Sequence, residues 1–265
     1  MNIHDIRAML AEDKATVGTW LQLPSSDVAE LLARAGYDWV AADMEHASFS
    51  RASLPDIFRA VENGGAVPFA RLPEVSKTAV KSVLEAGAQG LIFPMIESRE
   101  QLDLAIDLAT YPGQDDWRSA GERAGDYRGV GYCRANAFGK DFDAYLDGMA
   151  PHIFFVAQIE HIRAVRNLDA ILSHPRLDAI MVGPYDLSSS MGLTGRFDHP
   201  DFRAATAAIQ AACERHNIRM GLHIVRPDTR ELDRQIKNGA RFIAYGIDAV
   251  FLWLGAERPR QENLT

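Results

Sequence analysis

The sequence predicts a single-domain α/β fold, the TIM or (β/α)8 barrel, and two observations lead to that prediction. Eight short apolar runs alternate with segments of helical periodicity almost from end to end, which is the element count of this barrel. The runs are nearly continuously apolar, as strands are when both faces of a parallel sheet are covered. A doubly wound open sheet is the alternative, but it usually carries a glycine-rich turn after its first strand. Residues 22–26 are instead Gln-Leu-Pro-Ser-Ser, so the barrel is favoured.

The first four strands are each followed by a segment with clear helix signals. Serines at positions 25, 53, 76 and 98 precede apolar residues at helical spacing, and glycines follow three of these segments at positions 36, 64 and 87. Such residues are typical at the two ends of a helix. The later helices are expected at 162–172, 200–216 and 227–238. The predicted strands cover residues 17–23, 39–44, 68–72, 90–96, 153–159, 179–182, 219–225 and 241–246.

One long segment interrupts this alternation. Residues 111–151, between the fourth and fifth strands, are polar and rich in glycine. Loops of this length are usually functional or disordered. We interpret the segment as a lid or pocket wall on the active face of the barrel. A surface excursion with a short helix near 141–147 is the alternative.

Composition limits the class of protein. A chain of 265 residues with 47% hydrophobic content is long enough for one barrel domain over residues 1–265. Its net charge of -8 argues against a nucleic-acid partner, which requires a basic surface. The charged N-terminus lacks the apolar core of a signal peptide, and no apolar stretch reaches membrane-spanning length. The sequence therefore predicts a cytoplasmic protein with no membrane partner.

Two carboxylates stand where apolar strands end. Glu160 closes the fifth strand and Asp186 follows the sixth, and the carboxyl ends of barrel strands carry the active site. Two oxygen ligands with open positions suit Mg²⁺ or Mn²⁺, so we predict a metal site. The alternatives are that Glu160 pairs with an arginine and that Asp186 caps the next helix.

The second and third strands end in further polar side chains. Asp43, Glu45 and His46 lie together at the end of the second strand. Histidine is suited to proton transfer near neutral pH, and a neighbouring carboxylate orients it. Arg71 ends the third strand, where its guanidinium could bind a substrate oxyanion or neutralise Asp43 or Glu160.

The distribution of lysines disfavours imine chemistry. The only lysines are at positions 14, 77, 81, 140 and 237, outside every predicted strand, whereas Schiff-base catalysis needs a lysine in a desolvated pocket. Nucleophile-elbow and phosphate-loop motifs are also absent. These observations favour metal-stabilised enolate chemistry. His223, at the end of the seventh strand, is interpreted as a wall residue rather than a third metal ligand.

Several short segments together resemble one known family, the class II (metal-dependent) pyruvate aldolases. This family contains the 4-hydroxy-2-oxo-heptanedioate and 2-keto-3-deoxy sugar-acid aldolases of the phosphoenolpyruvate/pyruvate barrel superfamily. The likeness extends over most of the chain. It is carried by residues 18–21, 35–39, 43–46, 71, 87–90, 94–96, 128–131, 158–160 and 183–188.

The resemblance implies a lyase that joins pyruvate, as its enolate, to an aldehyde, or cleaves the product. It implies a divalent cation, Mg²⁺ or Mn²⁺ with Co²⁺ as a further option, held by Glu160 and Asp186. It also implies charge stabilisation by Arg71 and proton transfer by His46 paired with Asp43. Gln158, Gly183 and Pro184 would contact substrate. The family usually assembles as a homo-oligomer, a hexamer built from dimers.

Two departures from the family pattern concern the aldehyde. Extra residues lie between positions 113 and 128, and residues 132–138 are unusual, so the acceptor pocket is left open. The arginines at 118, 123 and 134 suggest an acidic or polyhydroxylated partner. An alternative function uses the same enolate in another condensation, as in citrate synthesis, or decarboxylates oxaloacetate. A non-catalytic binding barrel is the second alternative.

Overall fold

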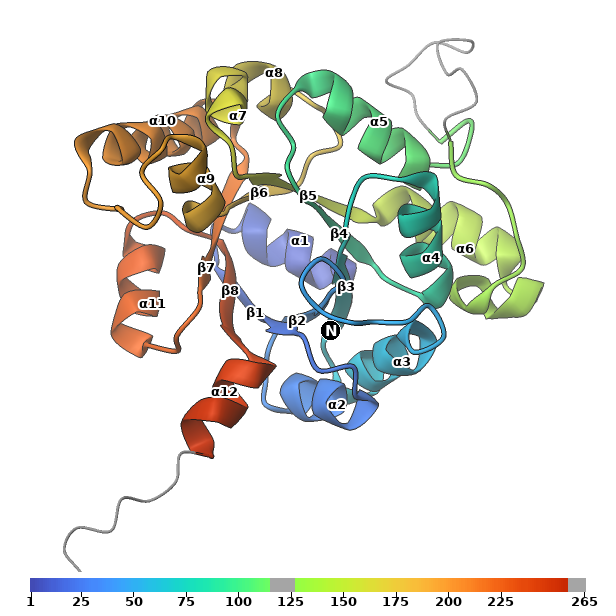
Figure 1. The fold of residues 1–265 in the computed structure, drawn as a ribbon. Helices are drawn as coiled ribbons and strands as arrows, with labels where there is room; N and C mark the ends of the chain where they lie inside the picture. The colour runs from blue at the N-terminus through green and yellow to red at the C-terminus, as the bar shows by residue number, and fades with distance from the viewer. Residues whose placement is uncertain (115–126, 257–265) are drawn as a thin grey trace, which may run out of the picture.

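A computed structural model describes residues 1–114 and 127–256 of the chain. Eight parallel strands form a closed barrel in the order β1 to β8, with helices around it (Figure 1). The predicted barrel is therefore confirmed, and the strand ends differ from the prediction by a few residues. The strands are β1 Thr16–Leu21, β2 Trp39–Asp43, β3 Val67–Arg71, β4 Gly90–Phe93, β5 Phe154–Ile159, β6 Ala179–Val182, β7 Arg219–Ile224 and β8 Phe242–Ile247.

The helices follow the predicted order, with additions. The segment predicted at 162–172 is divided into two short helices at Asn167, while the helix over 200–216 is as predicted. Three helices, α1, α9 and α12, have no counterpart in the prediction. The helices are α1 Ile3–Ala11, α2 Ser26–Arg34, α3 Leu54–Gly64, α4 Lys77–Ala86, α5 Arg99–Ala109, α6 Phe142–Gly148, α7 Ile162–Arg166, α8 Leu168–Leu172, α9 Pro184–Ser190, α10 Pro200–His216, α11 Thr229–Lys237 and α12 Asp248–Gly255, with 3-10 turns η1 Arg134–Gly139 and η2 Ala150–His152. None of the helices in the described ranges is both long and apolar enough to span a membrane.

Serine side chains cap three of the helices that they were expected to start. Ser25 accepts a hydrogen bond from the Val28 N–H, and Ser76 and Ser98 cap α4 and α5 in the same way. Ser53 precedes α3 but its side chain forms no capping bond. These bonds satisfy backbone donors that a helix start leaves free.

The interior of the barrel is filled by aromatic side chains. The rings of Trp39 and Phe242 stack with centroids 4.4 Å apart, and Phe69 and Phe154 lie against them. Gly18 makes room for this layer, since a Cβ there would lie 1.9 Å from the Trp39 ring. Close packing of these rings makes the strand ring a rigid base for side chains at its rim.

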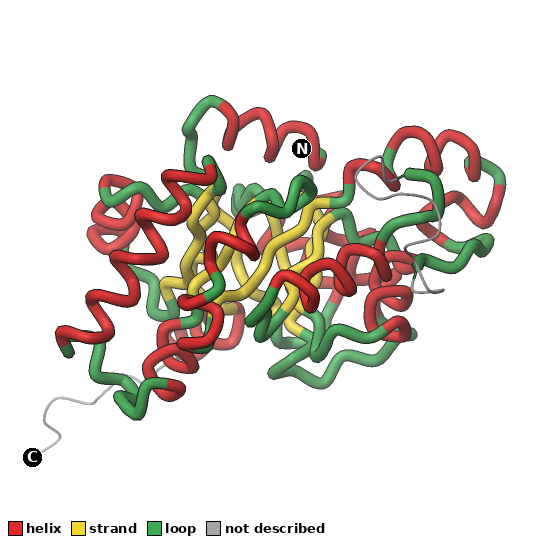
Figure 2. Tube along the Cα trace, turned by 90° about the horizontal axis from the view of Figure 1, so that it is seen from above, coloured by secondary structure: helices red, strands yellow, loops and turns green. Residues whose placement is uncertain are grey.

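Helix α1 closes the amino-terminal end of this interior. Its buried residues Ile3, Ile6 and Leu10 belong to the same apolar cluster as the barrel aromatics. Figure 1 looks into the ring of strands with α1 seen across it, and Figure 2 shows the strands from the side. Arg7 anchors the helix through its ion pair with Asp178, at 2.8 Å between Nε and Oδ1. A binding site would therefore lie at the opposite, carboxyl end of the barrel.

The position of the insertion corrects one prediction. Residues 111–151 follow α5 and lead into the start of β5, so they join the amino-terminal side of the barrel. The described part contains α6, as the alternative interpretation expected, and it packs outside α4. Arg134 donates to the Ala86 carbonyl at 2.7 Å and pairs with Glu62. The expected lid on the active face is therefore wrong for residues 127–151, and the arginines at 118 and 123 lie outside the described residues.

Candidate active site

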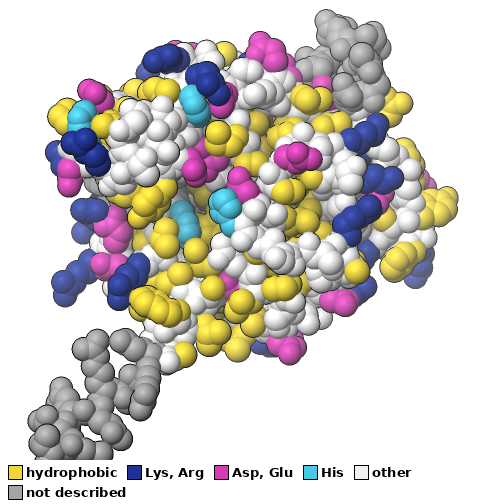
Figure 3. Space-filling view, viewed as in Figure 1, with side chains coloured by type: hydrophobic (Ala, Val, Ile, Leu, Met, Phe, Trp, Pro, Cys, Tyr) yellow, Lys and Arg dark blue, Asp and Glu magenta, His cyan; other side chains and the backbone are white. Residues whose placement is uncertain are grey.

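A cavity of about 200 Å³ lies at the carboxyl ends of the strands. It contains seven of the eight predicted site residues, and Asp43 lies behind Arg71 with no exposed surface. Figure 3 shows this face, where acidic and histidine side chains gather near the centre of the strand ring. The lining residues are Trp20, Gln22, His46, Arg71, Gln158, Glu160, Met181, Val182, Gly183, Pro184, Tyr185, Asp186, His223, Val225 and Ile247.

Glu160 is held by two hydrogen bonds at the end of β5. Gln158 Nε2 donates to one carboxylate oxygen at 2.9 Å, and the Met95 N–H donates to the other at 3.2 Å. Gly183 lies so close that a Cβ there would stand 2.3 Å from Glu160 Oε1. The side chain is therefore fixed in direction by its neighbours. The expected alternative, an arginine pair for Glu160, is not formed within residues 1–114 and 127–256.

The environment of Glu160 is short of positive charge. The pKa of Glu160 is raised to about 7, chiefly by burial; the charges of Glu45 and Asp186 also raise it, whereas the Met95 N–H and Arg71 lower it. Burial likewise raises the pKa of Glu45, with Asp43 and Asp186 adding to the effect. A carboxylate whose pKa is raised by burial and by like charges is a frequent mark of a functional site.

Asp186 lies in the first turn of α9, across the cavity from β5. Its side chain is exposed, and within the described ranges it forms no hydrogen bond or ion pair. Gly183 is the residue that precedes the helix, and no side chain caps it, so the capping role weighed for Asp186 is not observed. The carboxylate is free to bind a ligand.

These two carboxylates form a donor set that suits a hard divalent cation. Within residues 1–114 and 127–256, no group of three His, Cys, Asp or Glu side chains is arranged to hold a metal. The set therefore fits a cation that takes its remaining ligands from substrate and water, as open magnesium sites do. The raised pKa of Glu160 fits this too, because a cation would neutralise the crowded negative charge.

Arg71 is fixed by a two-pronged ion pair with Asp43. Its Nε and Nη2 donate to the two oxygens of Asp43 at 2.9 and 2.7 Å, and Gln22 Nε2 donates to the same carboxylate at 2.8 Å. Burial raises the pKa of Asp43, but the bonds from Arg71 and Gln22 outweigh it and lower the pKa overall. The guanidinium also lies 4.4 Å from the centroid of the Trp20 ring. Its remaining Nη1 is 3.3 Å from Glu45.

His46 reaches the cavity from the loop after β2. Its imidazole side chain is 58% exposed and lies 4.0 Å from Glu45 Oε2. Asp43 contacts His46 through the backbone alone, by accepting its N–H at 3.2 Å. The expected side-chain pairing of His46 with Asp43 is therefore not observed, because Arg71 and Gln22 occupy the Asp43 oxygens.

Trp20 and Gln22, two cavity residues that contact Arg71 and Asp43, were not predicted as part of the site, and neither was Glu45, which lies beside the cavity. Trp20 and Gln22 share a face of β1 at its carboxyl end, and this two-residue spacing was the available signal. Glu45 was noticed only as an acid near His46. Within the described residues, Trp20 Nε1 and Gln158 Oε1 are buried without a hydrogen-bond partner, and Glu45 Oε2 has ion-pair contacts but no hydrogen bond. Such atoms are donors and acceptors that a ligand could satisfy.

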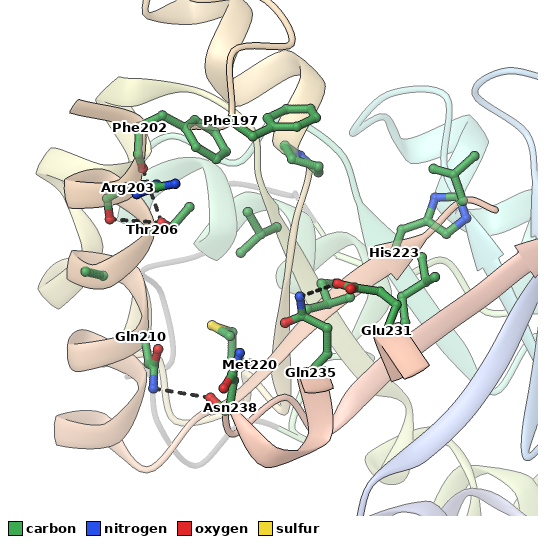
Figure 4. A pocket seen from close by; sticks show the side chains of 16 residues that line it. Phe197, Phe202, Arg203, Thr206, Gln210, Met220, His223, Glu231, Gln235 and Asn238 are labelled. Carbon is green, nitrogen blue, oxygen red and sulfur yellow. Dashed lines mark hydrogen bonds between the residues drawn. The ribbon is translucent and has the colours of Figure 1, made fainter. Parts of the chain in front are cut away.

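A larger cavity of about 620 Å³ lies outside the barrel, between α10 and α11 (Figure 4). Phe197, Phe202 and Met220 line it, and Glu231 bonds to Gln235 along its α11 side. It shares four lining residues with the smaller cavity: Val182, Pro184, His223 and Val225. The chemistry nevertheless belongs to the smaller cavity, because Glu160, Asp186 and Arg71 converge there.

Comparison with known proteins agrees with the fold and identifies the family. The family model described as HpcH/HpaI aldolase/citrate lyase matches residues 16–253. A hydroxypyruvate/pyruvate aldolase of Paraburkholderia phytofirmans is 33% identical over 97% of this chain and 96% of its own length. A 5-keto-4-deoxy-D-glucarate aldolase of Salmonella paratyphi C is 31% identical over 97% and 94%.

A solved structure supports the same assignment. An HpcH/HpaI aldolase/citrate lyase family protein from Burkholderia cenocepacia superposes with a TM-score of 0.85 and 32% identity, covering 95% of each chain. The family model spans all eight strands of the barrel. The chain therefore belongs to the HpcH/HpaI aldolase/citrate lyase family and is a carbon–carbon lyase.

Proposed function

We propose that this protein is a divalent-metal-dependent aldolase that forms or cleaves the bond between the methyl carbon of pyruvate and an aldehyde. The product would be a 4-hydroxy-2-oxo acid or a 2-keto-3-deoxy sugar acid. The observation that carries the proposal is the convergence of Glu160, Asp186 and the fixed Arg71 guanidinium on one cavity. The names of the aldolase relatives support it.

Glu160 and Asp186 would hold the cation, Mg²⁺ or Mn²⁺, with Co²⁺ as a further option. When bound, such a cation acts as a Lewis acid that draws negative charge onto the oxygens of a 2-oxo acid. Gln158 keeps the Glu160 carboxylate turned toward the cavity through its 2.9 Å hydrogen bond. The backbone of Gly183 and Pro184, next to Glu160, would contact the substrate from the β6 side.

Arg71 would stabilise the negative charge that develops on the substrate oxygen during enolate formation and aldol addition. Preorganised donors of this kind are usually the largest single contribution to catalysis. The ion pair with Asp43 and the stack on Trp20 hold the guanidinium in place before substrate binds. Asp43 is thus a positioning residue for Arg71.

His46 would carry the proton. In the condensation direction a base removes a methyl proton of pyruvate, the enolate carbon attacks the aldehyde carbon, and the new alkoxide takes up a proton as the C4 hydroxyl. Cleavage is the reverse. The exposed imidazole of His46 at the cavity edge can exchange this proton with water.

The test is hydrogen exchange of the pyruvate methyl group in D₂O, followed by NMR with Mg²⁺ or Mn²⁺ and with a chelator. We expect exchange that requires the metal and is lost in Glu160→Ala. The matched control is Glu74→Ala, which removes an exposed carboxylate in the loop after β3 and should exchange like the natural protein.

The same experiment separates the alternatives. Exchange that is independent of metal, or equal in Glu160→Ala, would show that the enolate mechanism is wrong. The absence of exchange in the natural protein with added metal would favour the non-catalytic barrel. Loss of oxaloacetate with no aldehyde addition would favour decarboxylation. The predicted cytoplasmic location and homo-oligomer, a hexamer by resemblance, stay predictions, and sedimentation of the purified protein tests the latter.

A further inference from the structure

His223 stands on the wall that the two cavities share. It lies near the carboxyl end of β7 and lines the barrel-mouth cavity together with Arg71 and Glu160. It also lines the edge of the side cavity, where Figure 4 shows it apart from the α10 residues. A substrate held at Glu160 and extending toward β7 would meet this imidazole.

The neighbours of His223 define its protonation. Burial lowers the pKa of His223 to about 4, with the carbonyl of Gly246 opposing and Arg71 adding to the effect. The ring is therefore neutral near pH 7. Nε2 lies 3.3 Å from the Gly246 carbonyl oxygen, and because a carbonyl only accepts, we place the ring hydrogen on Nε2. Nδ1 then carries a lone pair, which accepts hydrogen bonds.

No partner takes up that lone pair in the described residues. The ring packs edge-on against Trp20, with centroids 5.9 Å apart, and no hydrogen bond to Nδ1 is formed within residues 1–114 and 127–256. The surrounding wall is apolar, made by Val182, Pro184 and Val225. Nδ1 is thus a hydrogen-bond acceptor set in an apolar surface, an arrangement that selects ligands by a hydroxyl group.

The charged groups of the cavity stand on elements other than β7, because Arg71 ends β3, Glu160 follows β5 and Asp186 lies in α9. Arg71, Glu160 and Asp186 suit the anionic 2-oxo acid and its cation, which leaves the β7 wall for the uncharged partner. We propose that His223 determines the specificity for the aldehyde, by accepting a hydrogen bond from a hydroxyl group on the carbon next to the carbonyl. The inference rests on the proposed aldolase function and names the class of its second substrate, the 2-hydroxyaldehydes.

The test compares two aldehydes of nearly equal size, glycolaldehyde and propionaldehyde, which differ by a hydroxyl in place of a methyl group. The quantity measured is the ratio of their kcat/KM values for addition to pyruvate. This ratio does not depend on the fraction of folded enzyme. We expect the natural protein to favour glycolaldehyde, and His223→Leu to lower the ratio about tenfold, as expected for one hydrogen bond between uncharged groups.

Two further variants distinguish a direct contact from a structural role. His223→Gln keeps a hydrogen-bond acceptor and should restore most of the ratio. His216→Leu removes a histidine on α10 that bonds to Asp169 and should leave the ratio unchanged. An unchanged ratio in His223→Leu, or an equal loss in His223→Gln, would overturn the inference. Failure of the aldolase proposal itself would be seen separately, as absent methyl exchange in the natural protein.

Discussion

The two ends of the barrel each carry an arginine–aspartate pair, partly buried at the amino-terminal end and buried at the carboxyl end, in very different surroundings. At the amino-terminal end, Arg7 binds both oxygens of Asp178 and also donates to the carbonyls of His152 and Ile153. At the carboxyl end, Arg71 binds both oxygens of Asp43. There the guanidinium also lines a cavity with two further carboxylates, Glu160 and Asp186.

The difference lies in how completely the polar groups are satisfied. The Arg7 pair joins α1, β5 and β6, and its hydrogen bonds stay within the protein. The Arg71 pair adjoins Glu45, whose Oε2 lies 3.3 Å from Arg71 Nη1 without a hydrogen bond to it, and Glu160, whose pKa is raised to about 7. The amino-terminal end thus stabilises the fold, whereas the carboxyl end keeps uncompensated charge that a bound cation and substrate can compensate. Natural enzymes commonly show this trade between stability and activity.

The largest expected effect is a loss of catalytic activity when Arg71 is replaced but not when Arg7 is replaced. Arg71→Lys should lower kcat/KM for aldol cleavage about 10³-fold, because a lysine cannot reproduce the fork to Asp43 or the stack on Trp20. Steady-state kinetics at 25 °C measures this. Arg7→Lys is the matched control and should stay within about twofold of the natural protein, so similar losses in both variants would remove the distinction between the two ends.

The second effect is a loss of stability, which we expect to be larger when Arg7 is replaced than when Arg71 is replaced. Arg7→Ala leaves the Asp178 carboxylate without its main partner and should lower the free energy of unfolding by about 3 kcal/mol. Urea unfolding followed by circular dichroism measures it, and kcat of the folded variant should be retained. A stability loss larger in Arg71→Lys than in Arg7→Ala would contradict the assignment of stability to the amino-terminal end.

The third effect concerns the pH dependence of stability without metal. The pKa of Glu160 is raised from 4.5 to about 7 in the folded protein. Between these values the folded state holds a proton that the unfolded state has lost, so stability falls as pH rises through this window. Glu160→Gln removes the penalty and should be more stable than the natural protein by about 2 kcal/mol at pH 8, and by much less at pH 4.5.

Thermal unfolding with a chelator at the two pH values measures this difference. Added Mg²⁺ should then stabilise the natural protein at pH 8 and leave Glu160→Gln unchanged. A stability difference that is the same at both pH values would mean that the pKa of Glu160 is not raised in the folded protein.

Much of the fold could be predicted because it depends on local patterns. Continuous apolar runs identify buried parallel strands, and serine caps mark helix starts, as at Ser25 and Ser76. Helix α1 was missed although Ile3, Ile6 and Leu10 have helical spacing, because this short segment lies before the first strand. Residues 111–151 were predicted at the carboxyl end of the barrel. They lie at the amino-terminal end because they follow α5 and not β4, and the sequence pattern did not show this boundary clearly.

The residues of the site could be predicted where their position at the end of a strand brings them together. Glu160, Asp186, Arg71 and His46 reach one cavity because parallel strands bring all their carboxyl ends to the same rim. Trp20 and Gln22 were missed because an apolar or amide side chain at a strand end has no distinctive chemistry in a sequence. Their roles depend on what stands beside them, the guanidinium and the Asp43 carboxylate.

The sequence by itself determined the barrel and the rim of acidic side chains, because these follow from periodicity and from residue types at strand ends. The family followed from the resemblance of several short segments. Only the tertiary structure decided which groups pair. Asp43 binds Arg71 rather than the His46 imidazole, and Glu160 has no arginine partner among the residues that the structure describes. Distances across the barrel mouth set these pairings. The same packing places the His223 imidazole against Trp20, on the wall that the two cavities share.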